Sequence, residues 1–225
     1  MHKKRLTART VALIGFATIA AAAAVSIAGC AAHAPAPDHD AQMAAMMKSS
    51  FHDKGIAKVE WLKQDASNLA CSQAEGKPLP AATAQAIEAA NLKTVKWPSD
   101  GHFIGDWKAG EKLAQSGRGM TWNDKSTATS ANGGNCYNCH QVSKAEISFG
   151  TIGPSLYHYG KIRGVSNPAD PASKAIVEYT WSKIWNAKAY NACSNMPRFG
   201  HAGMLDEKQL KDIMALLLDP KSPVN

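Results

Sequence analysis

The chain has 225 residues, of which 45% are hydrophobic and 19% are charged, a composition typical of a globular protein and not of a disordered one. This length fits one core-forming domain together with an export signal and an extension. The formal net charge is +7, but residues 1–29 carry four basic side chains and no acidic one, so subtracting those four leaves +3. No basic stripe is interleaved with aromatic residues, which argues against nucleic acid as a partner.

Residues 1–29 have the features of a bacterial signal peptide. Basic residues precede an apolar run from Val11 to Ala28, and the run leads into Ala28-Gly29-Cys30, which resembles a lipobox. In this interpretation Cys30 is lipidated, and the protein is periplasmic with a possible membrane tether. Two alternatives stay open. One is ordinary cleavage after residue 34, where a proline would follow the cut. The other is an uncleaved anchor, for which the alanine-rich run is short.

Residues 30–100 are predicted to form a tether and an N-terminal extension. Residues 31–40 are rich in Ala, Pro and Asp, as in a flexible linker. Further along, Ala81 to Ala90 has the composition of a helix, and Trp-Pro-Ser-Asp-Gly at 97–101 indicates a turn.

Residues 101–225 are predicted to form a helical domain. Asp106 is a candidate N-cap for a helix over 107–115, and residues 118–135 indicate a loop. A second helix is expected over 173–185, with its tryptophans in the core. The last helix starts after Asp206, which has Gln209 three residues on in a capping-box pattern, and Pro220 lies just beyond its end.

Cys136-Tyr137-Asn138-Cys139-His140 carries the chemistry of the chain. A Cys-x-x-Cys-His run is the attachment signature of c-type haem, because two sulfurs from one turn reach the porphyrin vinyl groups and the histidine ligates the iron. A zinc site would need a second pair of ligands, and a thioredoxin-like site would need a βαβ context. The sequence therefore predicts one covalently bound haem c, held by Cys136, Cys139 and His140.

Met196 is the predicted second axial ligand of the iron. It lies in Asn195-Met196-Pro197, ahead of the last helix, and a thioether opposite a histidine raises the reduction potential. Met214 falls on the apolar face of that helix and is expected in the core. The competing candidates are Met120, Met204, Met214, His158 and His201.

Two cysteines remain, Cys71 and Cys193. Since an exported protein folds in an oxidising compartment, the pair is predicted to form a disulfide that ties the extension to the loop near the haem. The alternative is two buried free thiols.

The order of these motifs resembles class I cytochromes c, and so implies an all-α class I cytochrome c fold with an N-terminal extension. By that resemblance the carbonyl of Pro154, in Gly-Pro-Ser-Leu, accepts a hydrogen bond from His140 and orients it. Gly110 is implied at the close crossing of the first and last helices of the domain.

A narrower resemblance is to SoxX, the monohaem subunit of the SoxAX complex of bacterial sulfur oxidation. It rests on these stretches: GDWKAGEKLAQSGRG, GNCYNCH, GTIGPSLYHYGKIRG, CSNMPRFGHAG and LLLDPKSPVN. It implies a SoxA-like cytochrome partner, a SoxYZ-like carrier and an acceptor cytochrome c. The complex would be an L-cysteine S-thiosulfotransferase whose sulfur chemistry takes place on SoxA. No acid–base or nucleophile constellation is left over in this chain, so no catalytic residue is predicted.

Arg163 and Arg198 are candidate partners of the haem propionates, with plain surface arginines as the alternative. Two other functions stay open at this point. One is a lipid-anchored cytochrome c shuttle that serves a terminal oxidase. The other is a peroxidase or gas sensor, which would need an open iron position and is excluded if Met196 binds iron.

Overall fold

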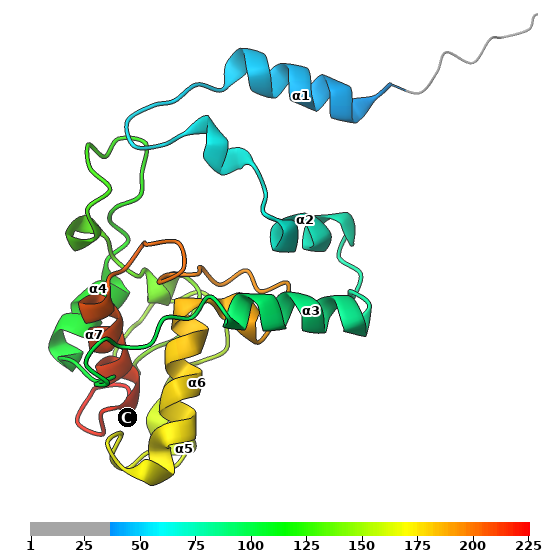
Figure 1. Cartoon of the computed structure of the whole chain (residues 1–225). Coiled ribbons are helices and arrows are strands. Elements are labelled where there is room, and N and C mark those ends of the chain that lie inside the picture. Colours follow the sequence, from blue (N-terminus) through cyan, green and yellow to red (C-terminus); the bar gives the residue numbers. More distant parts are fainter. Residues whose placement is uncertain (1–36) are drawn as a thin grey trace, which may run out of the picture. The chain divides into compact units, whose positions relative to one another are not determined.

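The structure is a computed structural model that describes residues 37–225 (Figure 1). The predicted signal peptide, Cys30 and most of the predicted tether lie outside the described residues. The chain divides into two compact units, residues 1–45 and 46–225. The part of the predicted extension from residue 46 to residue 100 therefore belongs to the same unit as the predicted helical domain.

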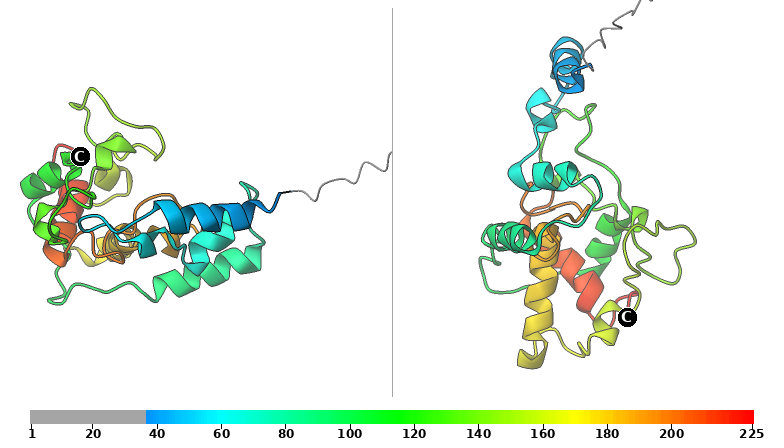
Figure 2. Two further views of the ribbon diagram at one scale, coloured as in Figure 1. Left: turned by 90° about the horizontal axis from the view of Figure 1, so that it is seen from above. Right: turned by 90° about the vertical axis from the view of Figure 1, so that its right-hand side faces the viewer.

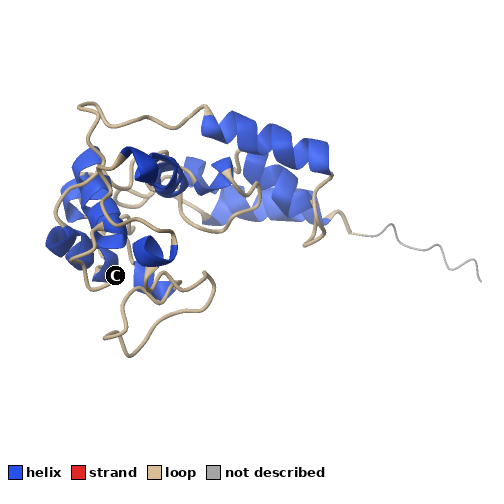
Figure 3. Ribbon diagram, turned by 90° about the horizontal axis from the view of Figure 1, so that it is seen from below, coloured by secondary structure: helices blue, strands red, loops and turns tan. Residues whose placement is uncertain are grey.

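Residues 37–225 are helical and contain no β-strand, only an isolated bridge between Lys54 and Ala57 (Figure 3). This confirms the all-α fold class. The α-helices are α1 (His39–Ser50), α2 (Ala66–Gln73), α3 (Ala81–Leu92), α4 (Trp107–Gln115), α5 (Tyr159–Ile162), α6 (Lys174–Trp185) and α7 (Glu207–Leu218). Five short 3-10 segments, η1 to η5, join them.

Helix α1 begins at His39, so the last two residues of the predicted tether are helical. None of its residues is buried. Among the helices of residues 37–225, none has the length and apolar character needed to cross a membrane.

The core forms where α7 packs between α4 and α6 (Figure 1). Helix α7 begins with the predicted capping box, in which Asp206 accepts from the Gln209 N–H and the Gln209 side chain accepts from the Asp206 N–H. Gly110 of α4 lies against α7, and a Cβ there would lie 3.1 Å from the Leu216 Cβ and closer still to the Asp212 backbone. Only glycine allows this crossing, because any larger residue would push the helices apart.

The extension is joined to the C-terminal end of α6. Helices α2 and α3 lie side by side (Figure 2), and the Asn91 amide of α3 donates to Ser67 Oγ of α2 at 3.1 Å. Trp181, which is 1% exposed, donates from its indole N–H to the Lys96 carbonyl at 2.8 Å, and Trp185 donates to the Thr94 carbonyl at 3.1 Å. The indole N–H groups of these core tryptophans thus find their hydrogen-bond acceptors on the backbone that follows α3.

Candidate functional site

A cavity that encloses about 930 Å³ of space between atoms, part of it open to solvent, lies beside the α4–α7 crossing. Most of its wall is apolar, with residues from α4, α6 and α7 and from the chain segments that precede α5 and α7. This apolar character suits the face of a large flat cofactor. The wall includes Ala114, Val142, Ile152, Leu156, Ile184, Phe199, Leu205, Ile213, Leu216 and Leu217.

Cys136, Cys139 and His140 all lie on the wall of this cavity. One tight turn carries all three residues. Asn135 adopts a left-handed conformation at φ 49°, and residues 136–138 then form a 3-10 helix. The His140 N–H closes the turn on the Cys136 carbonyl at 2.9 Å. Neither cysteine is part of a disulfide. The turn therefore presents two sulfurs and one imidazole to the same space.

The surroundings of the Cys136 thiol disfavour a dithiol redox centre. Burial raises the pKa of the Cys136 thiol to about 12, whereas a redox-active Cys-x-x-Cys needs a depressed pKa. Within residues 37–225 no three His, Cys, Asp or Glu side chains are grouped to hold a bare metal ion, which also disfavours a zinc site. A protonated thiol in an apolar wall fits covalent attachment of an apolar group.

The Gly-Pro loop fixes the imidazole of His140. The ring Nδ1 lies 2.6 Å from the Pro154 carbonyl, and since a carbonyl only accepts, Nδ1 is the donor. This is the contact that the resemblance implies. Gly153 lies against the same ring, where a Cβ would overlap Cε1 and Nδ1, and its own N–H donates to the Cys139 carbonyl at 2.8 Å. Nε2 is left as the nitrogen that can ligate a metal.

Met196 lines the same cavity, although it lies 56 residues beyond His140 in the sequence. Its N–H donates to Ser194 Oγ at 3.2 Å, and its side chain packs against the core. None of the competing candidates in the described chain lies on the cavity wall. Met214 is fully buried in the core, as expected, and His158 stacks on Tyr157 with ring centroids 3.8 Å apart. The structure thus brings together the four residues predicted to bind haem.

The two arginines have partners in the protein. Arg198 donates to Asp65 Oδ2 at 2.6 Å, and the Arg163 guanidinium lies 3.7 Å from the centre of the Tyr159 ring while also donating to the Tyr159 carbonyl. Neither arginine is part of the cavity wall. Their pairing with haem propionates stays a prediction.

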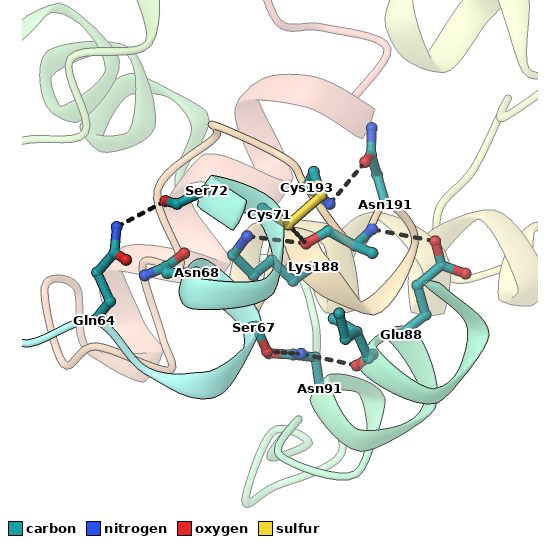
Figure 4. Close-up of a disulfide and its surroundings, with 12 residues drawn as sticks. Gln64, Ser67, Asn68, Cys71, Ser72, Glu88, Asn91, Lys188, Asn191 and Cys193 are labelled. Atoms are coloured by element: carbon teal, nitrogen blue, oxygen red, sulfur yellow. Dashed lines mark hydrogen bonds between the residues drawn. A yellow bond between two sulfur atoms is a disulfide. The ribbon is translucent and has the colours of Figure 1, made fainter. Parts of the chain in front are cut away.

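The predicted disulfide between Cys71 and Cys193 is present, with the two Cα atoms 5.5 Å apart (Figure 4). It links α2 to the loop that carries Met196, so the alternative of two free thiols is wrong. Sequence reasoning missed the polar residues around it, Asp65 and Glu88, since neither stands in a motif. It also passed over Gly153, although the Gly-Pro pair of the loop motif contains that residue.

The region that holds the cavity is similar to a known family. Residues 108–219 match the family model described as "Cytochrome c". The chain is also 38% identical over 134 residues to an "Uncharacterized lipoprotein" of Aquifex aeolicus (strain VF5). That alignment covers 59% of this chain and 58% of the relative, so the chain spans about three fifths of the length of the protein it matches.

The cavity fits the cofactor that this family implies, which is covalently bound haem c. Two thiols stand on one edge, an oriented imidazole stands beside them, and a thioether shares the wall. The remaining surface is apolar, as suits a porphyrin face.

Proposed function

We propose that this chain, whose residues 108–219 match the cytochrome c family, is the haem electron-transfer subunit of a SoxAX-type complex. Such a complex conjugates thiosulfate oxidatively to a cysteine of a SoxYZ-like carrier, and this subunit passes the electrons to another cytochrome c. The complex as a whole is then an L-cysteine S-thiosulfotransferase, with the sulfur chemistry on a SoxA-like partner.

The observation that carries the electron-transfer role is the convergence of four residues on one apolar cavity. Cys136 and Cys139 would hold the haem through thioether bonds, and His140 and Met196 would ligate its iron. When bound, haem c supplies a one-electron couple between ferrous and ferric iron. The Pro154 carbonyl fixes the tautomer of His140, and the apolar wall limits the access of water. Two protein ligands leave no open position, which disfavours a peroxidase or a gas sensor.

The sulfur-specific part of the proposal rests on the SoxX-like stretches of the sequence. Two of them, GTIGPSLYHYGKIRG and CSNMPRFGHAG, contribute Pro154 and Met196 to the site. The longer SoxX chains also resemble the segment around Cys71, and here that segment is bonded to the Met196 loop. A generic cytochrome c shuttle does not require this extension.

A second candidate is a lipid-anchored cytochrome c that serves a terminal oxidase. It is favoured by the lipobox-like sequence at Cys30 and by the name of the Aquifex relative, "Uncharacterized lipoprotein". The same features suggest a periplasmic protein tethered to a membrane in either case. Mass spectrometry of the mature N-terminus tests the anchor: we expect a lipidated Cys30, and an unmodified start at another residue would contradict it.

The two candidates are separated by what reduces the haem. The tagged, haem-loaded protein is isolated from cells grown on thiosulfate, and the captured material is analysed by haem staining and mass spectrometry. We expect a second c-type cytochrome in constant ratio, and reduction of the haem by thiosulfate only when the carrier protein is added. Isolation of a lone monohaem protein, whose haem is reduced equally well with and without the carrier, would favour the shuttle.

The ligand assignment is tested separately on the purified ferric protein. We expect a near-infrared band from the Met-to-iron bond in the wild type and its loss in Met196→Lys. An unchanged band in that variant would assign the sixth ligand to another residue.

A further inference from the structure

The loop from Asn191 to Gly200, here called the Met196 loop, has little regular structure of its own. It lies between the 3-10 segment η5 (Ala187–Ala189) and α7, and no α-helix includes any of its residues. Between residues 191 and 197, the backbone N–H groups that have partners bond within the loop or to Glu88. A loop without a ladder of backbone bonds moves easily unless it is held from outside.

The extension supplies that hold on both sides of Met196. Before it, Cys71 of α2 is bonded covalently to Cys193, and Glu88 of α3 accepts a hydrogen bond from the Ala192 N–H at 3.2 Å (Figure 4). After it, Arg198 donates to the carboxylate of Asp65, the N-cap of α2, at 2.6 Å. These contacts fall four and three residues before the methionine and two residues after it.

The extension is itself fixed to the core, so it can act as a rigid support. Asn186, which is fully buried, donates to Asn91 Oδ1 at 3.0 Å and to Thr94 Oγ1 at 2.9 Å. The indole N–H groups of Trp181 and Trp185 bond to the chain that follows. Displacing the Met196 loop would therefore strain contacts that are anchored on helix α6.

We propose that Cys71, Asp65 and Glu88 are positioning residues for Met196, holding its thioether where it can ligate the haem iron. This inference rests on the proposed function, because it takes Met196 as the sixth ligand. The extension acts as a clamp on the ligand loop, so loss of the clamp lowers the cost of displacing the methionine while the rest of the cavity stays in place. An exogenous ligand then competes more effectively for the iron.

The first test uses the haem-loaded variant Cys71→Ser/Cys193→Ser and titration of the ferric protein with imidazole. We expect the apparent affinity for imidazole to rise about tenfold, in the range of ordinary couplings between two sites. When the pH is raised, the Met-to-iron band of this variant is expected to disappear at a lower pH than the band of the wild type. Hydrogen exchange should speed up in residues 191–198 and stay unchanged in α7, a readout that does not depend on the iron.

The second test leaves the disulfide intact. Asp65→Asn keeps an N-cap side chain for α2, because asparagine caps as well as aspartate, but it removes the charge that Arg198 binds. We expect a rise in imidazole affinity of at most about fivefold, since the ion pair is partly exposed. Asp53→Asn is the matched control. It breaks the exposed Lys58–Asp53 pair, also in the extension, without touching the Met196 loop, and should leave the affinity unchanged.

The outcomes separate the clamp from the ligand assignment. If wild-type protein lacks the Met-to-iron band, the proposed ligand is wrong, whatever the variants do. If the band is present, and imidazole affinity in a folded Cys71→Ser/Cys193→Ser variant stays within twofold of wild type, the clamp is overturned. If that variant does not fold, Asp65→Asn decides: a rise above the Asp53→Asn control supports the clamp, and equality with the control overturns it.

Discussion

The helices that wall the cavity and the helices of the extension are held in place by different forces. Nine of the twelve residues of α7 are buried, whereas α2 and α3 together bury only Asn91. The extension is attached instead by a disulfide, by hydrogen bonds of buried amides and by the Asp65–Arg198 pair. The cavity wall must exclude water from a cofactor and so needs an apolar core. A segment that only positions one loop can be attached by a few directional contacts.

The largest expected effect is therefore a truncation in the cavity wall. Leu216 is 1% exposed, and Leu216→Ala should lower the free energy of unfolding by about 3 kcal/mol, through lost burial and the space left behind. Leu69 of α2 is 46% exposed, and Leu69→Ala should change the free energy of unfolding by about 0.5 kcal/mol or less. Guanidinium unfolding of both haem-loaded variants checks this. Equal losses would mean that the extension has an apolar core of its own.

The next effect concerns the joint between the two regions, which is the contact of Asn186 with α3 and the backbone that follows it. Asn186→Ala removes both amide donors to α3 and its following chain and leaves the Asn91 oxygen without that partner, so we expect a loss of about 2 kcal/mol. Thr94→Val keeps the shape of the side chain but removes the acceptor for Asn186 and the donor to the Asn91 carbonyl. Because Thr94 is only half-buried, its cost should be smaller, about 1 kcal/mol. Hydrogen exchange should show α3 opening before α7 in Asn186→Ala. If α3 and α7 open together, the joint is not a separate weak point.

The same contrast explains which elements could be predicted from the sequence. Helices α4 and α7 were predicted from an N-cap, a capping box and an apolar face, all of which are local signals. Their bounds agree with the structure to within a residue at their starts. Helix α2 was not predicted, because Leu69 is its only large apolar residue and its stabilising partner Cys193 lies 122 residues away.

The candidate site divides in the same way. Cys136, Cys139 and His140 stand in one contiguous motif, and the Pro154 contact follows from a second motif 14 residues on. The pairing of Cys71 with Cys193 was predicted only by counting cysteines in an exported chain. Arg198 was a candidate partner of a propionate, and the sequence gives no means to find Asp65, 133 residues earlier, as its partner in the structure.

The smallest expected effect is the pH-dependent contribution of Asp65. Burial acts to raise the pKa of this carboxyl, but the Asn68 N–H and the Arg198 guanidinium outweigh it, so the pKa lies below its ordinary value of 3.8. Because the folded-state pKa is the lower one, this stabilisation is fully present above the unfolded-state value and is lost as the pH falls through the folded-state value.

In Asp65→Asn the free energy of unfolding should therefore fall less steeply than in wild type between about pH 5 and pH 2. At neutral pH the two proteins should differ by less than about 1 kcal/mol, since the pair is partly exposed and screened by solvent. Denaturant unfolding across this pH range, at low and at high salt, measures both effects. If the difference shrinks in salt, the ion pair with Arg198 is its source. If it persists unchanged, the ion pair with Arg198 is not its source, and the charge of Asp65 contributes nothing to holding the extension on the Met196 loop.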